Sequence, residues 1–174
     1  MTIYRAAELS PDRRFRFRLS RWWNPGEAPK RVAFLMFNPS TADAGADDQT
    51  IRKCMGFAGR WGYNGIDVIN LYPLRSRDPR AMLDSRAALE EIDTNLDYIR
   101  VVGRDASALV CAWGCEDVTR RITNFNNHIL RVIENARLAA RWSPSCLGLT
   151  LGGSPRHPVM LGYDTKLVGF EVTA

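Results

Sequence analysis

The chain of 174 residues has the size of one ordinary domain, and we expect residues 1–174 to form a single unit. Hydrophobic residues make up 45% of it and charged residues 25%, which excludes a wholly disordered, collagen-like, coiled-coil or membrane-embedded chain. The net charge of +5 is compatible with a polyanionic partner such as DNA or a nucleotide, but does not require one.

Two sequence features bear on where the protein works. No apolar run follows the charged start at Arg5, so the N-terminus is not that of a secretory signal. No segment approaches the roughly 20 apolar residues of a membrane helix, so we expect a cytoplasmic protein without membrane contact. The four cysteines form no CxxC pair, and Cys54 and Cys146 are expected in the core. We expect no cofactor, and the sequence leaves the oligomeric state open.

The first predicted elements are two strands. Apolar and polar residues alternate over residues 15–22, which predicts a strand with one face in water. A turn at residues 24–26 leads to residues 32–37, which are apolar on both faces and predict a strand buried on both sides. We expect this first pair to add an N-terminal antiparallel edge to the sheet.

Helices and strands then alternate along the chain. Helical spacing begins after an acidic cap at Asp47-Asp48, continues to Trp61 and ends at Gly62. The elements predicted after it are a strand at 66–71, a helix at 85–102, a strand at 108–113, a helix at 118–136 and a short strand at 146–150. This order predicts a three-layer α/β/α domain with a mainly parallel central sheet.

Unusual polar side chains follow the predicted strands. They are Asn38, Ser40, Thr41 and Asp43 after the first buried strand, Asn70 and Tyr72 after the second, Trp113 at the end of the third, and Arg156 and His157 beyond the fourth. Ligands of open α/β sheets bind outside the carboxyl ends of the strands. We therefore expect these groups to converge on one rim of the sheet.

Each of these groups also has a purely structural interpretation. Asn38 begins a run of turn-forming residues, and Asn70 can simply satisfy a backbone group. Trp113 can be a core aromatic residue with its N–H paired, and Arg75 can belong to a solvated loop. His157 stands between an arginine and a proline, where packing alone gives little reason for a histidine, although single histidines are more often structural than catalytic.

Other site chemistries have weak or no signatures. Asp43, Asp47 and Asp48 could form a hard-cation site, but their spacing is not diagnostic, and a helix cap is the main interpretation of the last two. Ser40 is not in a G-x-S-x-G elbow. The absence of a P-loop and of G-x-G-x-x-G after a strand makes kinases, NTPases and dinucleotide-dependent dehydrogenases poor candidates.

An ordered set of motifs is similar to a bacterial and phage family known as domain of unknown function 1643. The motifs lie at residues 34–43, which include Asn38-Pro39-Ser40-Thr41-Ala42-Asp43, and at residues 47–52, 61–63, 70–71, 112–114 and 155–158. The resemblance extends from about residue 4 to residue 161. The family name implies no activity.

A more distant resemblance is to the uracil-DNA glycosylase superfamily, whose members are three-layer α/β domains. They carry a water-positioning motif after the first core strand, an asparagine after the next, and a late His-Pro motif. Asn38, Asn70 and His157 occur in that order here. The resemblance implies that Asn38 holds the attacking water, that His157 stabilises the departing base, and that Asn70 reads the base edge while Tyr72 stacks on it.

Three functions follow as hypotheses. The first is a nucleobase- or nucleic-acid-directed hydrolase of uracil-DNA-glycosylase type, which cleaves an N-glycosidic bond with an Asn-positioned water. The second is a non-catalytic nucleotide or nucleic-acid binding module with Arg75, Arg77 and Arg156 on phosphates. The third is a metal-dependent hydrolase that uses the three aspartates named above.

Overall fold

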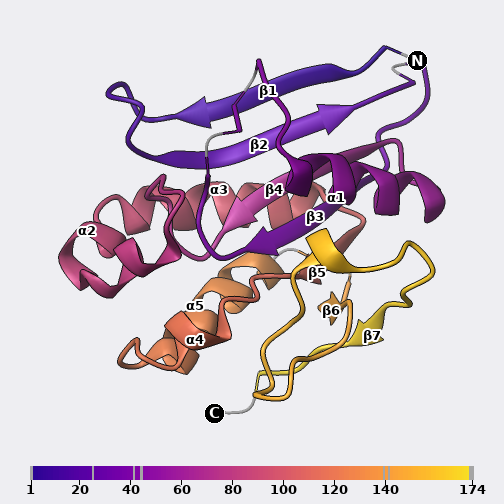
Figure 1. The fold of residues 1–174 in the computed structure, drawn as a ribbon. Helices are drawn as coiled ribbons and strands as arrows, with labels where there is room; N and C mark the ends of the chain where they lie inside the picture. The colour runs from indigo at the N-terminus through magenta and orange to yellow at the C-terminus, as the bar shows by residue number, and fades with distance from the viewer. Residues whose placement is uncertain are drawn as a thin grey trace.

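The computed structural model of the chain describes residues 2–24, 26–40, 42–43, 45–138, 140 and 142–172. These residues form a seven-stranded sheet in the order β1-β2-β4-β3-β5-β6-β7, which runs from top to bottom in Figure 1. The strands are β1 Tyr4–Leu9, β2 Arg16–Trp22, β3 Arg31–Met36, β4 Gly65–Asn70, β5 Ala108–Cys111, β6 Ser145–Cys146 and β7 Val168–Gly169. The helices are α1 Gln49–Arg60, α2 Ser85–Leu89, α3 Ile92–Asp105, α4 Glu116–Thr119 and α5 Phe125–Arg137, with two 3₁₀ turns, η1 Pro79–Leu83 and η2 Pro158–Met160.

The sheet is mixed, so the α/β class is confirmed and the prediction of a mainly parallel sheet is wrong. Strands β4, β3, β5 and β6 are parallel neighbours. On one side β2 joins β4 antiparallel and β1 joins β2, and on the other side β7 joins β6 antiparallel. The N-terminal antiparallel edge is present, but β2 pairs with β1 and β4, and not with β3 as the expected strand pair would require.

Two predicted helices are each divided in the structure. The segment 85–102 becomes α2 and α3 because Glu91 adopts a left-handed backbone with φ of 59°, which interrupts helical hydrogen bonding. The segment 118–136 becomes α4 and α5, with Asn124 at φ of 58° between them. The predicted strand 146–150 ends after Cys146, since Gly148 turns the chain with φ of 89°. By contrast, α1 has the predicted Asp48 cap, whose carboxylate accepts a hydrogen bond from Ile51 N at 2.9 Å.

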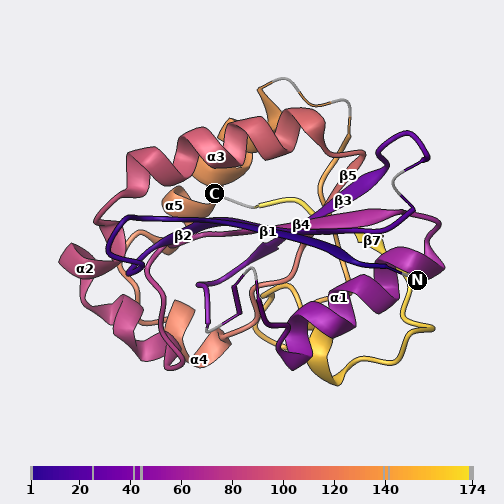
Figure 2. The same cartoon turned by 90° about the horizontal axis from the view of Figure 1, so that it is seen from above.

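Apolar side chains cover both faces of the sheet. The edge-on view in Figure 2 shows α3 on one side of the sheet and α1 on the other. Alternate residues of the central strands point to opposite sides. On one face Leu35 and Ile69 pack in a cluster with α3 and α5, and on the other Phe34 and Val68 pack in a cluster with α1. Within the described ranges, every helix falls short of the length or the apolar character that crossing a bilayer demands.

The four cysteines are free, and Cys54 and Cys146 are buried as predicted. The turn predicted at residues 24–26 falls partly on Pro25, which lies outside the described residues, as does the candidate site residue Thr41.

Candidate functional site

A cavity of about 170 Å³ lies where β3 and β4 end, on the α1 side of the sheet, and we call it the strand-end cavity. Five of the predicted site residues line it together, namely Asn38, Ser40, Asn70, Trp113 and His157. They come from four segments far apart in the sequence. The structure therefore brings the strand-end groups together on one rim, as the order of elements predicts.

Other predicted residues lie outside this cavity. Tyr72 is buried in the cluster under α3 and α5, where its ring stacks on His128 with centroids 4.5 Å apart, and burial raises the pKa of Tyr72 to about 12. Tyr72 therefore does not line the strand-end cavity, and the geometry gives no support to its stacking on a base there. The Arg75 guanidinium donates to the carbonyl of Arg13 at 2.9 Å, and Arg156 is exposed beyond the cavity lining.

The three aspartates do not gather around a common point. Asp43 pairs with Arg13 at 3.1 Å, and Asp47 pairs with Arg21 at 2.6 Å. Asp48 caps α1 and is the one aspartate of the three that lines the strand-end cavity. In the part of the chain that the structure describes, no three His, Cys, Asp or Glu side chains are arranged to hold a metal ion. The metal-dependent hypothesis therefore has no geometric support there.

Asn70 is the most informative residue of the cavity. Its side chain is fully buried, and neither Oδ1 nor Nδ2 has a hydrogen-bond partner among the described residues. Its main-chain carbonyl, in contrast, accepts a hydrogen bond from Asn95 Nδ2 at 3.0 Å. Buried polar atoms are nearly always paired, because an unpaired one costs about 1–3 kcal/mol. A donor and an acceptor left unpaired side by side at a cavity indicate a ligand that satisfies both.

Trp113 repeats this pattern less specifically. Its indole Nε1 is buried without an acceptor among the described residues. The residue lines the strand-end cavity and also a second cavity on the α5 side of the sheet. Trp113 is therefore a buried aromatic residue, as its structural interpretation predicts, but its N–H is not paired with a described residue.

Asn38 is held in one orientation. Its Nδ2 donates to the carbonyl of Ser76 at 2.9 Å and to that of Pro39 at 3.2 Å. Both bonds use the amide nitrogen, so Oδ1 remains to accept a hydrogen bond from a molecule in the cavity.

His157 presents a defined nitrogen to the cavity. Its Nδ1 accepts a hydrogen bond from Val159 N at 3.4 Å, which places the proton of the neutral ring on Nε2. Burial lowers the pKa of His157, and the attraction of Asp48 opposes that shift only in part. The segment passes so close to Gly114 that a Cβ there would lie 3.0 Å from His157 Cβ, and Gly114 N donates to Pro155 O at 2.9 Å. His157 is therefore a neutral N–H donor fixed by the end of β5.

Sequence reasoning missed several lining residues, of which Arg16 matters most; the others include Thr50, Ile51 and Cys115. Asp48 and Arg77 also line the cavity, but the sequence had suggested them for a metal site and for phosphate contacts. Alternation had placed Arg16 on a water-exposed face of β2, yet only 3% of it is exposed. The reason is a bulge, since the pairing passes from Glu8↔Arg18 to Leu9↔Arg16 and skips Phe17. Arg16 thereby reaches the face of the sheet that carries the cavity. Two other polar residues of this strand, Arg18 and Ser20, bind Asp67 of β4 at 2.9 and 2.5 Å.

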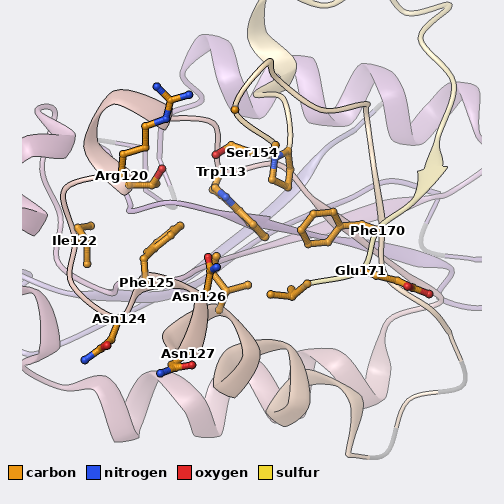
Figure 3. Close-up of a pocket in the computed structure, with 16 residues that line it drawn as sticks. Trp113, Arg120, Ile122, Asn124, Phe125, Asn126, Asn127, Ser154, Phe170 and Glu171 are labelled. Carbon is orange, nitrogen blue, oxygen red and sulfur yellow. The ribbon is translucent and has the colours of Figure 1, made fainter. Parts of the chain in front are cut away.

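Two larger cavities lie elsewhere, at about 530 and 680 Å³. The first is bounded by the start of α5, the 152–155 loop and residues 170–172, and Figure 3 shows Trp113 and Phe170 facing each other in it. Their ring centroids are 5.3 Å apart. Of the predicted site residues, Trp113 is the one that lines this cavity. The strand-end cavity is therefore not the candidate ligand site because of its size. It is the candidate because buried polar atoms without partners among the described residues line it.

Comparison with known proteins identifies a family but no characterised relative. A family model described as "Protein of unknown function (DUF1643)" matches residues 16–159, as the motif order predicted. No curated protein and no solved structure matches the chain.

Proposed function

The chain belongs to this family of unknown function, and we propose from its strand-end cavity that it is a hydrolase that binds a nucleobase and cleaves its N-glycosidic bond. The observation that carries the proposal is the buried Asn70 amide, whose donor and acceptor both lack partners among the described residues. A carboxamide presents the same pair of groups as the edge of a nucleobase, so the two can form paired hydrogen bonds.

The size of the cavity supports a single ring as the group inside it. Pockets for drug-sized ligands enclose roughly 300–1,000 Å³. The strand-end cavity encloses about 170 Å³, which suits a base without its sugar. The sugar and any phosphates would remain at the mouth, where the exposed Arg77 lies.

The remaining polar residues supply a coherent reaction. Asn38 Oδ1 accepts a hydrogen bond from a water that attacks C1′ of the sugar, so a C–O bond forms as the C–N bond breaks. The base leaves with the bonding electron pair, and the His157 Nε2–H group donates a hydrogen bond to its oxygen as negative charge develops. The proton that the attacking water loses is taken up by the departing base anion, so the products are the free base and the sugar hydroxyl. A positioned donor of this kind contributes about 10²–10³ in rate. The negative charge of the Asp48 carboxylate in the same cavity stabilises the positive charge that develops on the sugar.

The fold is part of the same proposal. Helices on both faces of a sheet with a parallel centre suit a uracil-DNA-glycosylase-like, three-layer arrangement. If the substrate is a duplex, the base must leave the stack to reach a cavity of this depth. Free nucleosides and single strands would reach it without that cost.

The test is base release from several substrates. Uracil-containing and mismatched duplexes, single-stranded DNA and free nucleosides would be incubated with the protein, and free base would be measured by chromatography and strand breaks on alkaline gels. We expect His157→Gln to lower base release by about 10²-fold or more. His128→Gln is the matched control, because His128 is half-buried like His157 but packs on Tyr72 outside the cavity.

The outcomes separate the hypotheses. Equal base release by the wild type and by His157→Gln would refute the assigned role of His157. Salt-sensitive binding without base release would replace the hydrolase with the binding module. An absence of both binding and release would exclude nucleobases as ligands.

A further inference from the structure

Arg16 is a buried cation without a counter-ion. Its side chain lines the strand-end cavity, and it belongs to no salt bridge among the described residues. The structure shows one hydrogen bond from its guanidinium, donated by Nη1 to Ala42 O at 2.8 Å. Nε is buried without an acceptor. A guanidinium has five N–H donors, so most of the hydrogen-bonding capacity of this group remains unused.

Arg21, on the same strand, is a buried arginine whose three guanidinium nitrogens all donate hydrogen bonds within the protein. Its Nε donates to the Asp47 carboxylate at 2.6 Å, and Nη2 donates to Asp43 O at 2.5 Å. Its Nη1 donates to Ser20 O at 2.8 Å. The segment before α1 and the strand itself therefore provide acceptors for each nitrogen of one buried arginine, while the other arginine is left facing a cavity.

The surroundings of Arg16 add to the contrast. Asp48 and Asp43 attract it at longer range, but Asp48 caps α1 and Asp43 pairs with Arg13. Arg21 and Arg75 repel it. Burial lowers the pKa of Arg16 to about 10, which leaves the guanidinium charged at neutral pH. An unpaired buried charge is costly unless something in the site compensates it.

We propose that Arg16 makes the strand-end cavity selective for a planar ring that carries a negative charge. The Asn70 amide and the His157 N–H group would hold the polar edge of the ring, and Arg16 would form charge-assisted hydrogen bonds with its anionic oxygen or nitrogen. The cavity of about 170 Å³ favours a ring that is itself the anion over a whole nucleotide phosphate. This inference rests on the proposed function, because it takes the same cavity as the ligand site. It specifies the ligand as an anionic heterocycle, and a base that leaves a sugar with the bonding electron pair is such an anion.

The test compares two rings of nearly equal shape and different charge. Barbiturate is an anion at neutral pH, and uracil is its neutral counterpart; orthophosphate serves as an anion without a ring. Isothermal titration calorimetry would measure all three with the unmodified protein. We expect barbiturate to bind about ten- to a hundredfold more tightly than uracil, and orthophosphate to bind more weakly than barbiturate.

The variants assign the preference to Arg16. Arg16→Met should reduce the ratio of the two ring affinities to about one, and Arg16→Lys should retain part of it because the charge remains. Arg80→Met is the control, since Arg80 is an exposed arginine that pairs with Asp78 at 3.0 Å and is not part of the cavity lining, and it should leave the ratio unchanged. Circular dichroism spectra would verify that each variant folds, and the ligand comparison in the unmodified protein needs no variant.

Equal affinity for the two rings, no binding of either, or orthophosphate binding as tightly as barbiturate would each overturn the inference. So would an unchanged preference in folded Arg16→Met. The proposed hydrolase can fail separately: a preference for barbiturate without any base release would sustain this inference and refute the hydrolase. Base release without the preference would do the reverse.

Discussion

Replacing Asn70 with leucine should stabilise the protein while it abolishes ligand binding. The side chain is fully buried, and both of its polar atoms lack partners among the described residues. An unsatisfied buried group costs about 1–3 kcal/mol, and an apolar side chain removes that cost. The adjoining cavity of about 170 Å³ has room for the branched end of leucine, so overpacking should be slight. We expect the free energy of unfolding to rise by about 1–3 kcal/mol.

Urea unfolding and thermal melting would measure this change. For a chain of this length, about 1–3 kcal/mol corresponds to a rise of about 2–12 °C in Tm. Asn95→Leu is the matched control, because Asn95 is equally buried but its Nδ2 donates to the Asn70 carbonyl at 3.0 Å. That variant loses an existing hydrogen bond and should be less stable than Asn70→Leu. If Asn70→Leu instead destabilised the protein by more than about 1 kcal/mol, the amide would be paired without a ligand, and the reasoning behind the cavity would be wrong.

Three further predictions follow from buried groups. Arg21→Met should lower the free energy of unfolding in urea by about 1.5–3 kcal/mol, because it removes the 2.6 Å partner of Asp47, which keeps Arg5 at 3.2 Å; a loss below about 1 kcal/mol would contradict this. Burial lowers the pKa values of His157 and His128 below the usual 6.5, so the unfolded chain binds protons first. Stability should be full above about pH 6.5 and fall as the pH drops towards 5, with a shallower fall in His157→Gln. Cys115 is half-buried beside the cavity with its pKa raised to about 11 by burial; it should be alkylated slowly but before the other three cysteines, and a bound ligand should protect it, as peptide mapping by mass spectrometry would show.

The rim of the sheet could be predicted because it depends on the order of elements alone. Once the apolar runs ending at Phe37 and Leu71 are recognised as neighbouring parallel strands, their following residues must meet at one edge. The order of elements thus predicts Asn38 and Asn70 on one rim, and the structure shows that both line one cavity there. That order could not place Tyr72, because the chain leaves the strand after Asn70 and the next side chains turn into the cluster under α3.

The errors have local physical causes that residue patterns do not show. Glu91 adopts a left-handed backbone although glutamate rarely does, so its type gave no sign that the first long helix would divide. Asn124 is of a type that favours this conformation, but a single asparagine inside an amphipathic pattern does not by itself predict a break. The edge strand β1 is largely exposed and β7 has only two residues, so neither shows an alternating apolar pattern. Without these antiparallel strands the predicted sheet was mainly parallel. Arg16 was assigned to solvent because a single skipped residue, Phe17, reverses the side to which it points.

The bulge between β1 and β2 also affects how readily the protein aggregates. β1 is the outermost strand, and an outer strand with free backbone groups can recruit strands from other molecules. Here the register shifts between Glu8 and Leu9, opposite the skipped residue, and charges at Arg5 and Glu8 interrupt the strand. A bulge and charged side chains are both features that hinder edge-to-edge aggregation. Deleting Phe17 would leave Arg16 opposite Leu9 and still directed to the cavity, but it would restore a regular register, straighten the border of the sheet and favour insoluble assemblies.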